Sequence, residues 1–286
     1  MLRLFPIGTS RLHWSLEYVA KHRAADTLFP GFGYFQSAMQ ISDVAMFLTG
    51  GELGAPAQYV FRKDASPSNP FDERFRMTSG AAAINSARSA FAAADVLVVE
   101  ISSPVEFLLG DAAVQGNPNH RIDAPYADVW RTGYYAIHEP SIPVRRVEAD
   151  DRAFAQALDR IAAAAGDRPV ICLSHIYRGE QDFGRASFAR RVRAGAKARG
   201  WKFTDAAAQC QRFGFRQTPG GDVDIHHLAW PGARSLAAEI VETACLAAHV
   251  APPVRALDAI ACDDEDFMIG GSKGAVRSSS QVPVGA

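Results

Sequence analysis

The chain has 286 residues, a formal net charge of −1 and 48% hydrophobic residues. Its length and composition are typical of one large domain or two small ones with a packed core. The balanced charge does not favour a nucleic-acid partner, because no basic stripe dominates the sequence. The basic residues within 185–199 fall in one predicted helix, where a solvated face accounts for them.

Two further classes are excluded by local composition. Neither the basic region and apolar run of a secretory signal nor the ~18 consecutive apolar residues of a membrane span is present. We therefore expect a cytoplasmic protein that does not span a membrane. Four cysteines are scattered without the paired spacing of a disulfide framework or a zinc site: Cys172, Cys210, Cys245 and Cys262.

The first predicted element is a buried strand at residues 2–7, a short apolar run that stops at Gly8. A helix follows, and either Thr9 or Ser10 can cap it. Residues 28–37 are rich in glycine and aromatic side chains and indicate a loop.

Strands and helices then alternate along the chain. Further helices are predicted at residues 37–51, 79–94, 151–167, 184–200 and 231–250. Further strands are predicted at residues 96–101, 168–176 and 201–206. This alternation, with near-continuous apolar runs in the strands, predicts a three-layer α/β/α sandwich around a parallel sheet.

We expect residues 1–250 to form one domain. A proline-rich, irregular insert is predicted near residues 103–147. Residues 251–286 are small and polar, with an acidic middle, and predict a flexible C-terminal tail.

Polar residues follow the predicted strands, at the sheet edge where ligands bind in parallel α/β proteins. Ser10 follows the first strand, and Asp224 and His227 lie three residues apart just before the last helix. A serine nucleophile needs a base to take its proton, and the base needs a carboxylate to orient it. These three residues can supply that chemistry in the order Ser, Asp, His.

The same residues carry a resemblance to a known family. Gly8-x-Ser10 after the first strand, together with D-x-x-H before the last helix, resembles the SGNH (GDSL-type) hydrolases. As is common in that family, His227 is followed five residues later by Gly232 and then by a Leu-Ala pair in the helix. The resemblance implies a flavodoxin-like fold and an esterase or acyl-transfer activity.

The resemblance also implies a role for each residue. Ser10 would be the nucleophile, His227 the base and Asp224 its orienting carboxylate. The oxyanion hole would use the amide of Ser10, a glycine amide from Gly33 or the nearby Gly31, and the Ser102 hydroxyl.

Two positions depart from the family pattern. Glu100-Ile-Ser-Ser replaces G-x-N-D, and Thr9 replaces the aspartate of G-D-S. Both changes resemble divergent branches such as the GSCFA-type domains found near surface-polysaccharide genes. A carbohydrate-linked acetyl ester is therefore the substrate to test first.

Other interpretations stay open. Ser10 could be only a helix cap, and His226 could replace His227 as the base. The chain could also be an inactive SGNH-like binding protein, or a transferase that uses a nucleotide-activated donor. No P-loop and no metal-ligand spacing is present, so we expect neither a cofactor nor a metal ion. No oligomeric state is predicted.

Overall fold

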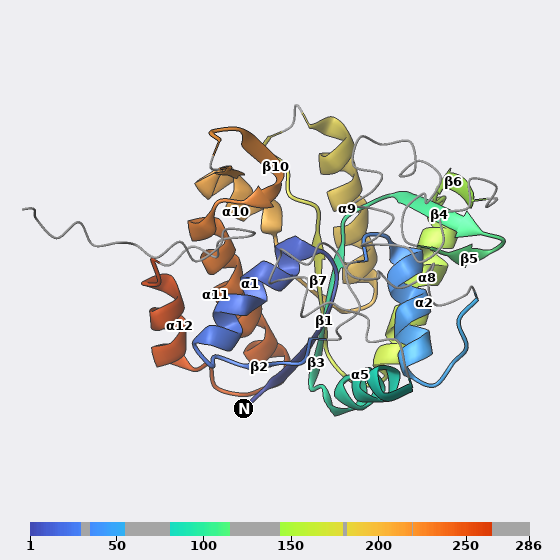
Figure 1. Ribbon diagram of the computed structural model, residues 1–286, viewed down its shortest axis with the longest axis horizontal. Helices are drawn as coiled ribbons and strands as arrows, with labels where there is room; N and C mark the ends of the chain where they lie inside the picture. Colours follow the sequence, from blue (N-terminus) through green and yellow to red (C-terminus); the bar gives the residue numbers. More distant parts are fainter. Residues whose placement is uncertain (30–34, 55–80, 115–143, 180–181, 219, 265–286) are drawn as a thin grey trace, which may run out of the picture.

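A five-stranded parallel sheet forms the centre of the protein (Figure 1). The computed structural model describes residues 1–29, 35–54, 81–114, 144–179, 182–218 and 220–264. Neighbouring strands follow the order β2-β1-β3-β7-β8, and every pair is parallel. The strands are β1 (Arg3–Ile7), β2 (Asp26–Thr27), β3 (Val96–Ile101), β7 (Val170–Ser174) and β8 (Lys202–Phe203). The predicted α/β class with a parallel sheet is confirmed.

Helices cover both faces of this sheet (Figure 1). Side chains of β3 alternate between two cores: Val96 and Val98 pack in one, Leu97 and Val99 in the other. This alternation follows from the two-residue period of a strand, and it explains why β3 is apolar from Val96 to Val99. The helices are α1 (Ser10–Lys21), α2 (Ala38–Leu48), α5 (Ala81–Ala93), α8 (Asp151–Ala165), α9 (Phe183–Ala198), α10 (Ala206–Phe213), α11 (Trp230–Ala247) and α12 (Val254–Ala261).

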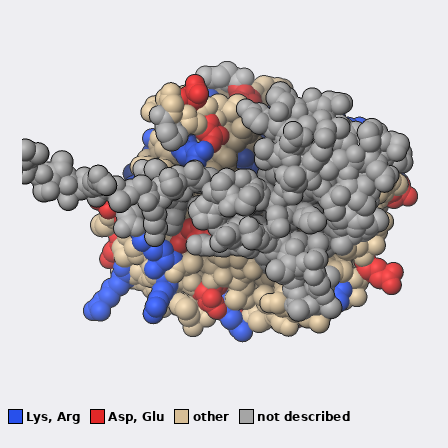
Figure 2. All heavy atoms as spheres, in the orientation of Figure 1, with Lys and Arg blue, Asp and Glu red and all other residues tan. Residues whose placement is uncertain are grey.

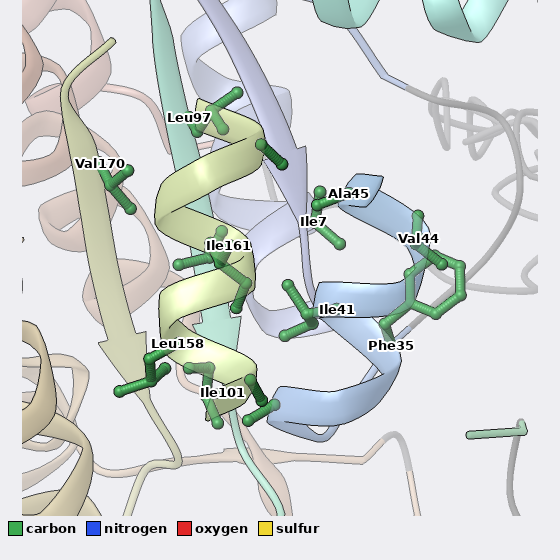
Figure 3. Packing of buried hydrophobic residues seen from close by; sticks show 14 of the residues in the cluster. Ile7, Phe35, Ile41, Val44, Ala45, Leu97, Ile101, Leu158, Ile161 and Val170 are labelled. Atoms are coloured by element: carbon green, nitrogen blue, oxygen red, sulfur yellow. The ribbon is translucent and has the colours of Figure 1, made fainter. Parts of the chain in front are cut away.

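The core under α2 and α8 is seen from close by in Figure 3. Ile7 and Leu97 from the sheet, Ile41 from α2 and Ile161 from α8 are each at most 1% exposed. The opposite core is formed with α1, α10, α11 and α12. The two cores hold the central strands from both sides, so the carboxyl ends of β1, β3 and β7 meet at one edge.

The predicted insert contains a small antiparallel sheet with the order β5-β4-β6. Its strands are β4 (Val105–Leu109), β5 (Ala112–Ala113) and β6 (Val144–Glu148). Residues 115–143 of the insert lie outside the described residues, as do residues 30–34 of the predicted glycine-rich loop.

A separate two-stranded sheet lies between α10 and α11 in the chain. It pairs β9 (Phe215–Gln217) with β10 (Val223–Leu228) in antiparallel fashion, and its register shifts between Asp224 and Leu228. Neither this hairpin nor α10 is predicted from the sequence. Turn residues at 218–221, between short segments, are the signal that could have indicated the hairpin.

The predicted C-terminal tail begins with an ordered element. Residues 254–261 form α12, whose Leu257 and Ile260 are buried in the core with α1 and α11. Residues 265–286 lie outside the described residues.

Among the described helices, none has the length and apolar character needed to cross a membrane. Figure 2 shows acidic and basic side chains interspersed over the described part of one face.

Candidate active site

Ser10 lies at the point where β1 gives way to α1. Thr9 takes the extended N-cap position, with φ −104° and ψ −177°, and Ser10 is the first residue of the helix. Gly8 is needed before them, because a Cβ at Gly8 would lie 2.7 Å from the Cβ of Glu100 on β3. The amide of Ser10 belongs to the first helical turn, where N–H groups have no partner within the helix and favour an anion.

The Ser10 hydroxyl faces a histidine from the far end of the sequence. Its Oγ lies 2.6 Å from Nε2 of His227 on β10, and Nδ1 of His227 lies 2.7 Å from Oδ2 of Asp224. The carboxylate accepts from Nδ1, so Nε2 is left with a lone pair that accepts the serine proton. The structure thus brings together the three residues that the sequence analysis singles out as a triad.

The neighbouring His226 makes no such contact. Its backbone N–H donates to Oδ1 of Asp224 at 3.1 Å, and its side chain is exposed. Of the two adjacent histidines, His227 is therefore the one placed to take a proton from Ser10.

Electrostatics favour a neutral imidazole and a charged carboxylate in this chain of hydrogen bonds. Burial lowers the pKa of His227, and the cations Arg11 and Arg216 lower it further against the opposing effect of Asp224. Burial raises the pKa of Asp224, but the hydrogen bond and charge of His227 outweigh it, with help from the His226 amide and Arg216, and hold the pKa well below its usual range. His227 is thus in its basic form at neutral pH.

An aromatic ring supports the imidazole. Trp14 on α1 stacks on His227 with ring centroids 3.9 Å apart and an interplanar angle of 18°. The guanidinium of Arg216 lies over Trp14 at 4.9 Å and over Trp230 at 5.8 Å. Trp14 thus belongs to the site, whereas the adjacent His13 is fully buried in the interior beside Phe29.

A buried ion pair lies behind Ser10. Oε1 of Glu100 accepts from Nε of Arg11 at 2.6 Å, and Oε2 accepts from both the amide and the hydroxyl of Thr9, at 3.0 and 2.6 Å. Arg11 also donates to the backbone carbonyl of His226 at 3.0 Å. Glu100 and Arg11 therefore link the β1–α1 turn to the strand that carries His227.

The predicted oxyanion donors have different outcomes. Gly33 and the alternative Gly31 lie outside the described residues. Ser102 directs its amide to the carbonyl of Gln36 at 2.7 Å, and its hydroxyl contacts the same carbonyl at 3.4 Å. Among the described residues, Ser102 makes no hydrogen bond to Ser10 or His227, so its oxyanion role stays a prediction.

A cleft of about 490 Å³ opens at the same edge of the sheet. Its lining includes Ser102 after β3, His175 after β7, and Phe183 and Arg185 at the start of α9. Burial and the Arg11 charge lower the pKa of His175 to about 2. Nδ1 of this neutral ring donates to the Ile176 carbonyl, so the ring serves as a fixed part of the wall.

Comparison with known proteins finds no relative of this chain: no family model, curated protein or solved structure matches it. In the part of the chain that the structure describes, no group of three or more His, Cys, Asp or Glu side chains is placed to hold a metal ion.

Proposed function

We propose that this protein is a serine esterase or acyl-transfer enzyme with Ser10 as nucleophile, His227 as base and Asp224 as orienting carboxylate. One observation carries the proposal: a continuous chain of hydrogen bonds, 2.6 and 2.7 Å long, joins residues 217 positions apart in the sequence. A helix cap does not need such an arrangement, and Thr9, not Ser10, holds the cap position. The resemblance to SGNH hydrolases supports the same roles.

The proposed reaction begins when Ser10 Oγ attacks the ester carbonyl carbon and its proton passes to Nε2 of His227. Asp224 stabilises the imidazolium that forms. The tetrahedral oxyanion is held by the Ser10 amide, with Gly33 and Ser102 as further proposed donors. As the intermediate collapses, His227 returns the proton to the departing alkoxide, which leaves an acyl group on Ser10.

The second half uses the same residues in reverse. His227 takes a proton from water, or from an acceptor hydroxyl, and the resulting oxygen nucleophile attacks the acyl-enzyme. Ser10 leaves with the proton from His227, and a carboxylic acid or a new ester is released. A carbohydrate-linked acetyl ester is the substrate to test first, on family analogy alone.

One observation favours a second candidate, an inactive binding protein on the same frame. Ser102 stands where the resemblance expects an oxyanion-hole asparagine, and both its amide and its hydroxyl contact Gln36. Loss of one oxyanion donor costs about 10²–10³ in rate. Binding without turnover is the expected outcome if no other group replaces this donor.

Labelling with a fluorophosphonate probe tests the proposal. We expect the wild type to label, Ser10→Ala not to label, and His227→Ala to label at least about 10² times more slowly, because the base is lost. His226→Ala is the matched control, since its exposed side chain is outside the triad, and it should label like the wild type. A folded wild type that never labels would contradict the proposal and favour the binding protein.

A further inference from the structure

Arg216 is a mostly buried cation next to the triad, and the sequence analysis does not identify it. It lies on β9, and its Nη2 donates to Oδ2 of Asp224 at 2.7 Å, the same oxygen that accepts from His227. The side chains of Arg216 and Asp224 are 19% and 14% exposed. One carboxylate oxygen therefore serves both the imidazole and the guanidinium.

Trp14 joins these groups from a different element. Its indole stacks on the His227 ring at 3.9 Å and also receives the Arg216 guanidinium at 4.9 Å. A planar guanidinium can both stack on an aromatic face and make cation–π contact with it, and Arg does so more often than Lys. Arg216 is thus fixed by a carboxylate and an aromatic surface, with little freedom to move away from His227.

Stability alone does not explain this arrangement. A buried guanidinium loses its hydration, and one ion pair often does not offset that cost. Among the residues that the structure describes, Nε of Arg216 has no hydrogen-bond partner. Local costs of this kind are expected at functional sites.

We infer that Arg216 is a positioning residue for the proposed acyl-transfer reaction: it holds Asp224 in place and keeps the His227 imidazole uncharged and ready to accept the serine proton. Only the catalytic role of Arg216 rests on the proposed function. The coupling between Arg216 and His227 is a property of the fold that can be measured without any turnover.

The charges around His227 fix the direction of the effect. Burial opposes the imidazolium most, Asp224 on β10 favours it, and the charges of Arg11 on α1 and, less strongly, Arg216 on β9 oppose it. His226, the adjacent residue, also has a lowered pKa, so it adds no charge at neutral pH. Removal of Arg216 leaves the effect of Asp224 less opposed, so the pKa of His227 must rise.

The test measures the protonation of His227 directly. The Cε1–H signal is followed by NMR in protein with labelled histidine, and it is assigned by its loss in His227→Gln. In Arg216→Gln we expect the midpoint to rise, by up to about one pH unit. Arg216→Lys restores the positive charge and should return the midpoint to near the wild-type value.

Fluorophosphonate labelling against pH gives the second readout. At pH values below the His227 midpoint of the variant, Arg216→Gln should label up to about tenfold more slowly than the wild type, because His227 is neutral in fewer of its molecules. Arg216→Met keeps an apolar stem over the tryptophans and replaces the Gln variant if that one does not fold.

The outcomes separate the two proposals. An unchanged His227 midpoint in a folded Arg216→Gln or Arg216→Met protein overturns the inference. A raised midpoint that Arg216→Lys reverses supports it. A raised midpoint in a protein that never labels at any pH supports the Arg216–His227 coupling and contradicts the proposed function.

Discussion

Glu100 is the residue that ties the β1–α1 turn, which carries Ser10, to the sheet. Its two carboxylate oxygens accept three hydrogen bonds, one from Arg11 and two from Thr9, and its side chain is 2% exposed. Arg11, at 7% exposure, is almost as deeply buried. A charge pair at this depth depends on both partners, because either one alone would be an uncompensated buried charge.

We expect Glu100→Gln to lower the free energy of unfolding by about 3–5 kcal/mol, because Arg11 would keep its charge without a counterion. The matched control is Asp95→Asn, which breaks the exposed pair of Asp95 with Arg3, and it should cost no more than about 1 kcal/mol. Urea denaturation of the two variants measures the difference. Equal costs would show that the Glu100 network does not anchor the turn.

The contacts of His227 with Ser10 and Asp224 could be predicted from the sequence because their signals are local. Asp224 and His227 are three residues apart, and Ser10 directly follows an apolar strand. Arg216 could not be found in the same way, since its role depends on the pairing of Asp224 with Arg216 across a hairpin. The contact of Ser102 with Gln36 also depends on tertiary structure. Alignment of Ser102 with a family position therefore does not indicate where its hydroxyl points.

At the scale of elements, α12 shows how a short amphipathic helix can escape notice. It has eight residues, and only Leu257 and Ile260 are buried, so only two side chains mark the face that packs on the core. The acidic and polar residues that follow make the whole segment resemble a tail. Packing against α11 stabilises a helix that its own sequence would hold only marginally.

Ile260→Ala should lower the free energy of unfolding by about 2–5 kcal/mol, because it removes a fully buried side chain and leaves a cavity. Val254→Ala, on the same helix but 62% exposed, is the control and should change it by no more than about 0.5 kcal/mol. Chemical denaturation of both variants is the measurement. If Ile260→Ala is as mild as the control, α12 is not part of the cooperative fold.

The long central parallel strands were the most predictable elements, whereas the two-residue β2 and the hairpin were not predicted. β3 and β7 are buried along their whole length because both of their faces are covered, and Glu100 and Ser174 are their only polar residues. β9 and β10 have three and six residues, and all but one of these are at least partly exposed. A strand that lines a site carries polar residues that serve the site. These residues interrupt the apolar pattern from which a strand is predicted.

For the molecule as a whole, buried titratable groups outside the triad make stability depend on pH in opposite directions. Burial lowers the pKa of His13 to about 3 and, with Arg11, that of His175 to about 2. Both rings bind protons more weakly in the folded state than in the unfolded state, where the pKa is 6.5. Their contribution to stability is therefore lost as the pH falls below 6.5.

Glu106 acts in the opposite sense and lies where the insert meets the main domain. On β4, 1% exposed, it accepts hydrogen bonds from the Ser37 hydroxyl and the Met39 amide at the start of α2. Burial raises its pKa from 4.5 to about 7, and the nearby Asp43 contributes, against the two hydrogen bonds. The folded state then binds a proton between pH 4.5 and 7 that the unfolded state has released, so stability falls as the pH rises through this window.

Glu106→Gln isolates that contribution, because glutamine has the shape of the protonated acid and cannot ionise. We expect the free energy of unfolding of the wild type, relative to the variant, to fall by about 3 kcal/mol between pH 4.5 and pH 8. Urea denaturation of both proteins across this range measures it, with the exposed Glu52→Gln as a control that should show no such trend. The histidine contributions are common to all three proteins and cancel in the comparison. A difference in the free energy of unfolding between wild type and Glu106→Gln that does not change with pH would contradict this expectation. It would mean that Glu106 ionises as readily in the folded protein as in the unfolded chain, and that a charge on Glu106 does not weaken the contact between the insert and α2.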